Sequence, residues 1–370
     1  MSTLRRIVIM ACLCLYWTAC SEEKNQSNDD QQVPHFEWDP GSAATRPVEI
    51  APYSDGNIAI LCDHYDLNRS SLTGFAPDGT IRFQKQLPAY YGVANELDYN
   101  NGVFTFVLNP TRVGSNPLFM QVDTTGNVIN QKQFVQTAYT SMYKLNSGGY
   151  MIRAATADSF KNKIGKLDDD GDILWEKEIS RNYTTLYVVD DRVFVSYFNT
   201  DNTSYFMSSF DEFGNVLWTT ELSTLAQPLI CKIANQDYRI TGLLYNQYKY
   251  RFDRLTISVM DQDGVITPLD TIPLNGTSDF YALESLVAGE LVLVGRWSGT
   301  SKLLFMRIMN DGSWIDSYIV PDLNDFTHYR VRPTGNGAYL IMGTTYQSST
   351  GLPTVMVYKV DAYGNYLAFD

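Results

Sequence analysis

The sequence is poor in histidine, in cysteine and in long apolar runs. It holds three histidines and five cysteines in 370 residues, and it lacks the Gly-x-Ser-x-Gly, His-Glu-x-x-His and phosphate-loop motifs. Without those motifs, the corresponding hydrolases, zinc proteases and nucleotide-binding proteins are not indicated, and we expect no cofactor and no metal. The longest apolar run covers residues 7–17, which is too short to span a bilayer as a helix.

Basic residues are also scarce. There are 28 Lys and Arg against 41 Asp and Glu, which gives a formal net charge of −13. Such a surface repels a phosphate backbone, so a nucleic acid is not expected as a partner. The remaining composition is that of an ordinary globular protein, but aromatic residues reach 13%, with 25 Tyr and 18 Phe. These residues favour pleated, half-buried surfaces, so the composition indicates β structure.

The amino-terminal segment has the features of an export signal. Arg5 and Arg6 precede the apolar run, and Thr18, Ala19 and Cys20 follow it, so residues 1–19 are predicted to be a signal peptide. This arrangement resembles the bacterial lipobox, although Trp17 replaces the usual aliphatic residue. The resemblance implies cleavage before Cys20 and a lipid bilayer as a partner through the acylated Cys20 thiol. A plain secretory signal and an uncleaved anchor are the alternatives.

Residues 20–43 are expected to form a flexible acidic tether. Residues 21–32 contain no apolar side chain, so they cannot bury enough surface to fold. An acidic stretch behind a lipidated cysteine resembles the surface-export signal of Bacteroidetes lipoproteins, which implies an outer-membrane lipoprotein on the cell surface. A generic linker with the protein facing the periplasm is the alternative. After cleavage, Cys62 and Cys231 remain in the domain and are expected to be free buried thiols, although the compartment permits a disulfide.

One glycine turn recurs seven times along the rest of the chain. The glycines are separated by 43 to 52 residues: Gly79, Gly126, Gly171, Gly214, Gly264, Gly312 and Gly364. Four residues before each glycine stand the apolar residues Phe75, Val122, Leu167, Phe210, Met260, Ile308 and Val360. Two residues after each stand Ile81, Val128, Ile173, Val216, Ile266, Trp314 and Tyr366. Three residues before, an Asp occurs in five copies: Asp123, Asp168, Asp211, Asp261 and Asp361.

The repeated turn is interpreted as a β-hairpin. Glycine supplies positive φ, Asp accepts hydrogen bonds from nearby amides, and both flanking apolar positions are expected to pack against a core. Two further strands precede each hairpin; in the sixth unit the four strands are placed at 282–287, 291–297, 303–309 and 313–320. Seven such units predict an all-β, seven-bladed β-propeller of four-stranded antiparallel blades over residues 44–370. We expect this domain to be monomeric. A tandem β-sandwich is the alternative.

The repeat resembles those of quinoprotein-type and WD-repeat propellers in its spacing and its Asp–Gly–Trp pattern. The tryptophan is present at Trp175 and Trp218, and Phe83 takes the equivalent place in the first unit. The Gly-His and Trp-Asp pairs of true WD repeats are absent. The resemblance implies the fold and leaves the activity open.

The predicted binding residues lie on one face of this propeller. In each blade, the glycine hairpins and the turns between the first two strands emerge on one side, here named the hairpin face, and the other connections emerge on the opposite side, the loop face. The loop face has the longer connections, where binding residues tend to lie. Its aromatic candidates are Tyr90, Tyr91, Tyr139, Tyr183, Tyr245, Tyr248, Tyr250 and Trp297. Such residues suit sugars or protein partners, or they simply cover strand ends.

The favoured function is a non-catalytic binding or scaffold module for a glycan or a partner protein. A carbohydrate-active enzyme, a glycosidase or a lyase, is the rival, because such enzymes need only two suitably spaced carboxylates in a central pocket. A purely structural assembly partner is a third hypothesis. Residues 168–172 resemble a calcium loop superficially, but hairpin turn chemistry explains them better. His64 and His328 would be neighbours in a closed ring, where they could form a functional pair or simply lie on the surface.

Overall fold

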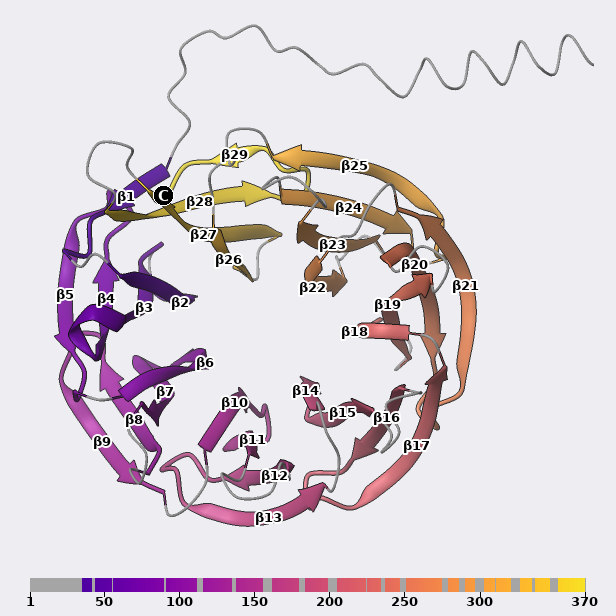
Figure 1. The fold of residues 1–370 in the computed structure, drawn as a ribbon, viewed down its shortest axis with the longest axis horizontal. Helices are drawn as coiled ribbons and strands as arrows, with labels where there is room; N and C mark the ends of the chain where they lie inside the picture. Colours follow the sequence, from indigo (N-terminus) through magenta and orange to yellow (C-terminus); the bar gives the residue numbers. More distant parts are fainter. Residues whose placement is uncertain are drawn as a thin grey trace, which may run out of the picture. The chain divides into compact units, whose positions relative to one another are not determined.

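The structure is a computed structural model, and it confirms the propeller (Figure 1). It describes residues 35–41, 44–54, 56–89, 91–111, 116–134, 138–155, 162–179, 184–198, 205–223, 225–233, 237–246, 251–274, 279–285, 290–296, 303–309, 311–320, 327–334, 337–346 and 352–369. Seven antiparallel sheets are arranged radially, with the first strand of each sheet near the centre of the ring and the fourth on its rim. None of the helices in these ranges is long and apolar enough to cross a membrane.

The first four blades follow the chain in order. Blade one comprises β2 (Thr45–Pro52), β3 (Ile58–His64), the 3-10 turn η2 (Tyr65–Leu67), β4 (Arg69–Phe75) and β5 (Ile81–Gln86). Blade two comprises β6 (Tyr91–Asn100), β7 (Val103–Pro110), β8 (Leu118–Asp123) and β9 (Val128–Gln133). Blade three comprises β10 (Ala138–Lys144), β11 (Tyr150–Ala155), β12 (Asn162–Leu167) and β13 (Ile173–Ile179). Blade four comprises β14 (Thr184–Val189), β15 (Arg192–Phe198), β16 (Tyr205–Phe210) and β17 (Val216–Ser223).

The last three blades complete the ring. Blade five comprises β18 (Leu225–Lys232), β19 (Tyr238–Asn246), β20 (Arg251–Met260) and β21 (Ile266–Pro273). Blade six comprises β22 (Asp279–Ser285), β23 (Glu290–Arg296), β24 (Leu303–Met309) and β25 (Trp314–Val320), close to the predicted bounds. Blade seven comprises β26 (Thr327–Pro333), β27 (Ala338–Tyr346), β28 (Pro353–Asp361), the short β29 (Tyr366–Leu367) and β1 (His35–Trp38).

The ring closes through the amino-terminal end of the propeller. β1 pairs with β28 in antiparallel register, from His35 opposite Tyr358 to Trp38 opposite Val355. Trp38 is buried and belongs to a core cluster shared by blades seven and one. The tether boundary expected at residue 43 therefore differs from the structure, because residues 35–38 already form part of the last blade. The sequence pattern did not predict this strand, because the four residues of β1 contain none of the turn residues that mark the repeated hairpins.

The recurrent glycines all adopt positive φ, between 77° and 91°. The Asp three positions earlier accepts hydrogen bonds from two backbone amides of the same turn; Asp211, for example, accepts from the amides of Phe213 and Asn215 at 3.0 and 2.8 Å. Units one and six lack that Asp but carry one directly before the glycine, where Asp78 and Asp311 each accept a turn amide. Both arrangements satisfy the turn's backbone donors.

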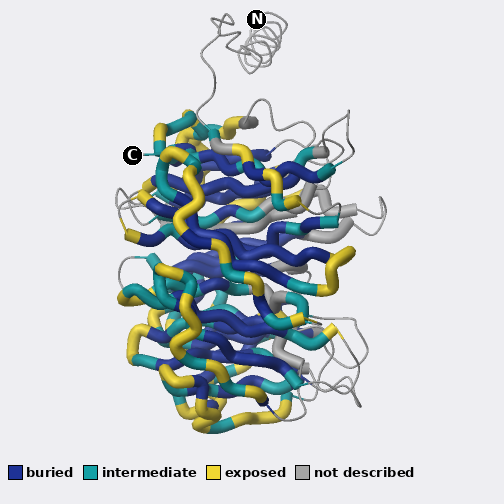
Figure 2. Tube along the Cα trace, turned by 90° about the vertical axis from the view of Figure 1, so that its left-hand side faces the viewer, coloured by how far each residue is buried: buried dark blue, intermediate teal, exposed yellow. Residues whose placement is uncertain are grey.

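The two apolar positions of the repeat have different environments. The residue four before the glycine is buried in all seven units, as in Phe75 and Leu167. The residue two after it was expected in the core, but Ile81, Val128, Ile173, Val216 and Trp314 are exposed and Ile266 and Tyr366 are half-buried. Those residues begin the outermost strand, which no neighbouring strand covers, and Figure 2 shows exposed residues along that rim. Their β-branched and aromatic character fits strand preference instead of burial.

Each blade packs on the next through buried side chains and a contact at the hairpin. Trp175 on β13 lies so close to Gly214 of blade four that an added Cβ would come within 2.8 Å of the indole ring. The Trp175 indole N–H also donates to the carbonyl oxygen of Glu212 at 2.9 Å. Trp218 makes the same two contacts with the hairpin that contains Gly264. The repeated tryptophan therefore joins adjacent blades, and the turn glycine is needed for its φ and for this close approach.

Candidate functional site

A charged cluster joins the innermost strands of blades seven, one and two. The Arg332 guanidinium on β26 donates from Nε to Glu49 Oε1 at 2.9 Å and from one terminal nitrogen to Glu49 Oε2 at 2.8 Å. The same terminal nitrogen donates to Glu96 Oε2 at 2.8 Å. Glu49 is buried, and Glu96 and Arg332 are half-buried. Two carboxylates therefore share one guanidinium, which is a fork geometry that favours arginine.

The cluster perturbs the protonation of its members. Burial raises the pKa of Glu96 to about 7, and the negative Glu49 adds to this effect while Arg332 opposes it. Burial alone would lower the pKa of Arg332, but the charges of Glu49 and Glu96 outweigh it and raise that pKa. Tyr143, on β10 of blade three, forms a hydrogen bond with Glu96, and burial raises the pKa of the Tyr143 phenol well above its usual value. The cluster keeps a net negative charge when both carboxylates are ionised.

These contacts also hold the ring closed. Arg332 and Glu49 are 283 residues apart in the chain, and the neighbouring Arg330 donates from Nε to the carbonyl oxygen of Val48 at 2.7 Å. Blade seven is thereby joined to blades one and two near the axis. At the rim, the chain segment that precedes blade one pairs with blade seven through β1 and β28. Structural closure is thus one role that the arrangement performs directly.

A first cleft, of about 610 Å³, opens on the hairpin face between blades two and three. It is lined by Asp98, Tyr99, Asn100, Asn101, Val103, Thr105, Gln121, Lys144, Leu145, Asn146, Gly148, Tyr150 and Asp169. The Tyr150 hydroxyl donates to Thr105 Oγ1 at 3.0 Å, and Lys144 is paired with Asp169. Lys144 Nζ also lies 4.4 Å from the centre of the Tyr150 ring. Burial raises the pKa of Asp98, against the opposing charge of Lys144.

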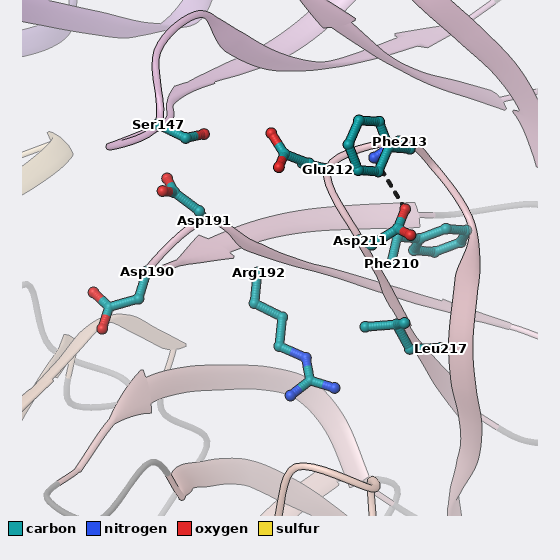
Figure 3. A pocket seen from close by; sticks show the side chains of 9 residues that line it. All are labelled: Ser147, Asp190, Asp191, Arg192, Phe210, Asp211, Glu212, Phe213 and Leu217. Atoms are coloured by element: carbon teal, nitrogen blue, oxygen red, sulfur yellow. Dashed lines mark hydrogen bonds between the residues drawn. The ribbon is translucent and has the colours of Figure 1, made fainter.

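A second cleft, of about 430 Å³, lies on the same face between blades three and four (Figure 3). It is lined by Ser147, Asp190, Asp191, Arg192, Phe210, Asp211, Glu212, Phe213 and Leu217. Asp190 and Asp191 form the turn between β14 and β15, both with positive φ. Asp190 is paired with Lys232, and Glu212 with Lys166 at 2.8 Å.

Most of the aromatic residues predicted on the loop face fall outside what the structure describes. Tyr90, Tyr183, Tyr248, Tyr250 and Trp297 lie outside the described residues. Tyr139 lies on β10 and Tyr245 on β19, but their side chains are not described. Tyr91 is half-buried at the start of β6, packs against the core shared by blades one and two, and accepts a hydrogen bond at its carbonyl oxygen from Ser70. The structure therefore assigns no common site to this set.

The other sequence candidates have partners within the fold. His64 is buried, with Nδ1 2.8 Å from Thr45 Oγ1 and Nε2 2.8 Å from Ser71 Oγ, so it serves the core of blade one; the His328 side chain is not described. In the calcium-like loop, Asp168 accepts two turn amides, as turn chemistry requires. Cys62 and Cys231 are buried thiols that form no disulfide, as expected. Cys20 lies outside the described residues.

Sequence reasoning missed the residues of the central cluster and of both clefts. Glu49, Glu96 and Arg332 are scattered over three blades, and only ring closure brings them together. Phe213 did carry a signal, since it stands directly before a turn glycine where Asp occurs in four other units. The longer connections of the loop face favour that face as the binding surface, and a departure at one turn of the hairpin face gives little signal beside them.

Known proteins resemble this chain in fold. No family model and no curated protein matches it. Among solved structures, the Dos1 propeller aligns with a TM-score of 0.55 at 10% identity, covering 85% of this chain and 78% of that one. A protein from Lactobacillus plantarum aligns with a TM-score of 0.50 at 11% identity, covering 77% and 89%. Prolyl oligopeptidase B from Galerina marginata aligns with a TM-score of 0.57 at 9% identity, covering 88% of this chain and 51% of that one. The chain thus spans about half the length of that peptidase, and at these identities the likeness shows the propeller fold alone.

Proposed function

We propose that this chain is an outer-membrane, surface-exposed lipoprotein whose propeller is a non-catalytic binding or scaffold module for a glycan or a partner protein. The anchor rests on the sequence, with Cys20 as the lipidated residue and residues 21–32 as the spacer. The binding role rests on one structural observation: two open clefts on the hairpin face present amide, hydroxyl and aromatic side chains. A fixed propeller scaffold with irregular surface positions is a common platform for recognition.

The state of the charged groups favours binding over catalysis. The Glu49 and Glu96 carboxylates are already engaged by Arg332. In the clefts, Asp169, Asp190 and Glu212 are paired with lysines, and Asp211 accepts two backbone amides. Groups held in this way are poorly placed to exchange protons with a substrate. Such groups serve instead to fix the geometry of a recognition surface.

Two measurements test this proposal. Labelling of cells with a fatty-acid analogue should mark the wild-type chain and leave Cys20→Ser unlabelled, and labelled Cys20→Ser would exclude the anchor. The purified full chain in detergent should bind glycans on an array, or it should capture a partner protein in a pull-down from the cell surface. Silence in both assays would contradict the binding role.

The rival function, a carbohydrate-active enzyme, is favoured by one specific observation. Glu49 and Glu96 contact the same guanidinium nitrogen, and a carboxyl with its pKa raised to about 7 suits a general acid. Release of reducing sugar from a polysaccharide panel, lost in Glu96→Gln, would establish this enzyme. The binding proposal predicts no release from wild type or variant.

A further inference from the structure

The two clefts on the hairpin face are neighbours that share one turn. Asn146, in the turn between β10 and β11, lines the first cleft, and the next residue, Ser147, lines the second. Asp191 of the second cleft also accepts a hydrogen bond from the backbone amide of Asn146. The clefts therefore adjoin across the turn of blade three and reach from blade two to blade four. We name this combined surface the hairpin-face trough.

The trough contains an aromatic residue that the fold does not require. Phe213 is 71% exposed at the tip of its hairpin, and Figure 3 shows it among the side chains that line the second cleft. Four other units have Asp at this position: Asp78, Asp170, Asp263 and Asp311. Tyr363 also departs, but its ring is covered by the Arg307 guanidinium at 4.2 Å. An exposed phenyl ring where turn chemistry favours a polar residue indicates contact with another molecule.

The polar groups of the trough suit an uncharged ligand. Lys144 is paired with Asp169, and two further carboxylates of the trough, Asp190 and Glu212, are paired with Lys232 and Lys166. The exposed polar groups that remain in the first cleft include the amides of Asn100, Asn101 and Asn146. An amide offers two donors and an acceptor, which matches the mixed donors and acceptors of sugar hydroxyls better than the charge of a basic peptide.

We propose that the hairpin-face trough binds a neutral carbohydrate chain, with one sugar ring packed on Phe213 and hydroxyl groups hydrogen-bonded to Asn101 and Asn146. This inference rests on the binding function proposed above and gives its two clefts a ligand class and named contact residues. The length of the trough, from blade two to blade four, matches an extended chain better than a single sugar.

The test measures affinity of the full chain, purified in detergent micelles, for linear gluco-, xylo-, manno- and galacto-oligosaccharides by titration calorimetry. Phe213→Asp should weaken binding by about tenfold or more, and Phe213→Trp should restore it. Asn101→Gly should weaken binding several-fold, because glycine suits the positive φ of this position and only the amide is lost. Phe213→Asp should fold normally, since it restores the residue found in the equivalent turns.

Asp263→Ala is the matched control, because it changes the same position in the hairpin of blade five, and its affinity should equal that of the wild type. If the wild type binds a sugar and Phe213→Asp and Asn101→Gly bind equally well, the trough is not the site, although the binding function stands. If no sugar binds and Phe213→Asp instead abolishes binding of a protein, the carbohydrate ligand is wrong. If the wild type binds neither, the proposed function fails as well.

Discussion

The inner and outer ends of the blades are built on different principles. At the rim, one hairpin recurs seven times, with positive φ at its glycine and an Asp that caps its turn. Near the axis, the contacts are individual: Arg332 joins Glu49 and Glu96 in a cluster that has no counterpart in the sequence repeat. Residues that recur in every repeat are those that each blade needs to fold. Residues that occur in one blade only are candidates for a role specific to that blade.

The same reasoning applies within the rim. The hairpins of blades four and five have the same Asp cap and glycine, yet one carries Phe213 and the other Asp263 at its tip. A substitution in one repeat can therefore be compared with the same substitution at the equivalent position of another repeat. The predictions below use such controls to test which contacts are structural.

The largest effect is expected at the inner end. Arg332→Leu should destabilise the propeller by about 3–5 kcal/mol at pH 8, because it leaves the Glu49 and Glu96 carboxylates partly buried without their cation. Chemical denaturation of the full chain measures this loss. Adding Glu96→Gln should recover part of it, because one of the unpaired charges is removed.

The exposed Arg82 on β5 provides the control for Arg332. Arg82→Leu should change stability by no more than about 0.5 kcal/mol, as for ordinary surface substitutions. Equal losses of stability in the two arginine variants would show that the central cluster does not stabilise ring closure.

The next largest effect is expected at the contact between blades. Gly214→Ala should cost roughly 2–4 kcal/mol, because it strains a residue at φ 79° and brings the new Cβ within 2.8 Å of the Trp175 ring. Gly337→Ala has the same strain at φ 80° but open space around it, so it should cost only about 1 kcal/mol. Equal losses of stability in the two variants would show that the Trp175 ring moves aside at little cost and does not hold blades three and four together.

The parts that sequence could predict were those governed by local chemistry. Glycine turns, Asp caps and the buried residue before them repeat in sequence because each hairpin forms from contacts within a few residues. The rim residue after the glycine was misassigned to the core, since strand preference and burial favour the same side chains. Strand β1 and the pairing of Arg332 with Glu49 depend on ring closure between distant segments, and no local pattern encodes that pairing.

A smaller, pH-dependent effect is expected at Glu96. Its pKa in the folded protein is raised from 4.5 to about 7, so the folded state binds the proton more tightly than the unfolded state. The resulting stabilisation is complete below pH 4.5 and is lost as the pH rises through 7. Relative to Glu96→Gln, the wild type should therefore lose up to about 3 kcal/mol between pH 4.5 and 8. Denaturation of both proteins across this range measures the difference, and a constant difference would exclude a raised pKa.

The smallest effect is expected at a single turn. Asp123 accepts hydrogen bonds from the amides of Thr125 and Asn127, both at 2.9 Å, and the Thr125 hydroxyl leads the contacts that lower the Asp123 pKa to about 2. Because the folded pKa lies below the unfolded value of 3.8, the stabilisation is present above pH 3.8 and is lost as the pH falls through 2. Asp123→Asn should cost about 1 kcal/mol at pH 7 and nearly nothing at pH 2, since the amide oxygen still accepts but without charge. Asp263→Asn, in the turn of blade five, is the control. It removes an exposed carboxylate, while Asp261 still accepts the two turn amides, so stability should be unchanged at both pH values. A loss at Asp263 as large as at Asp123 would mean that general surface charge, and not the capping hydrogen bonds, stabilises the repeated hairpin.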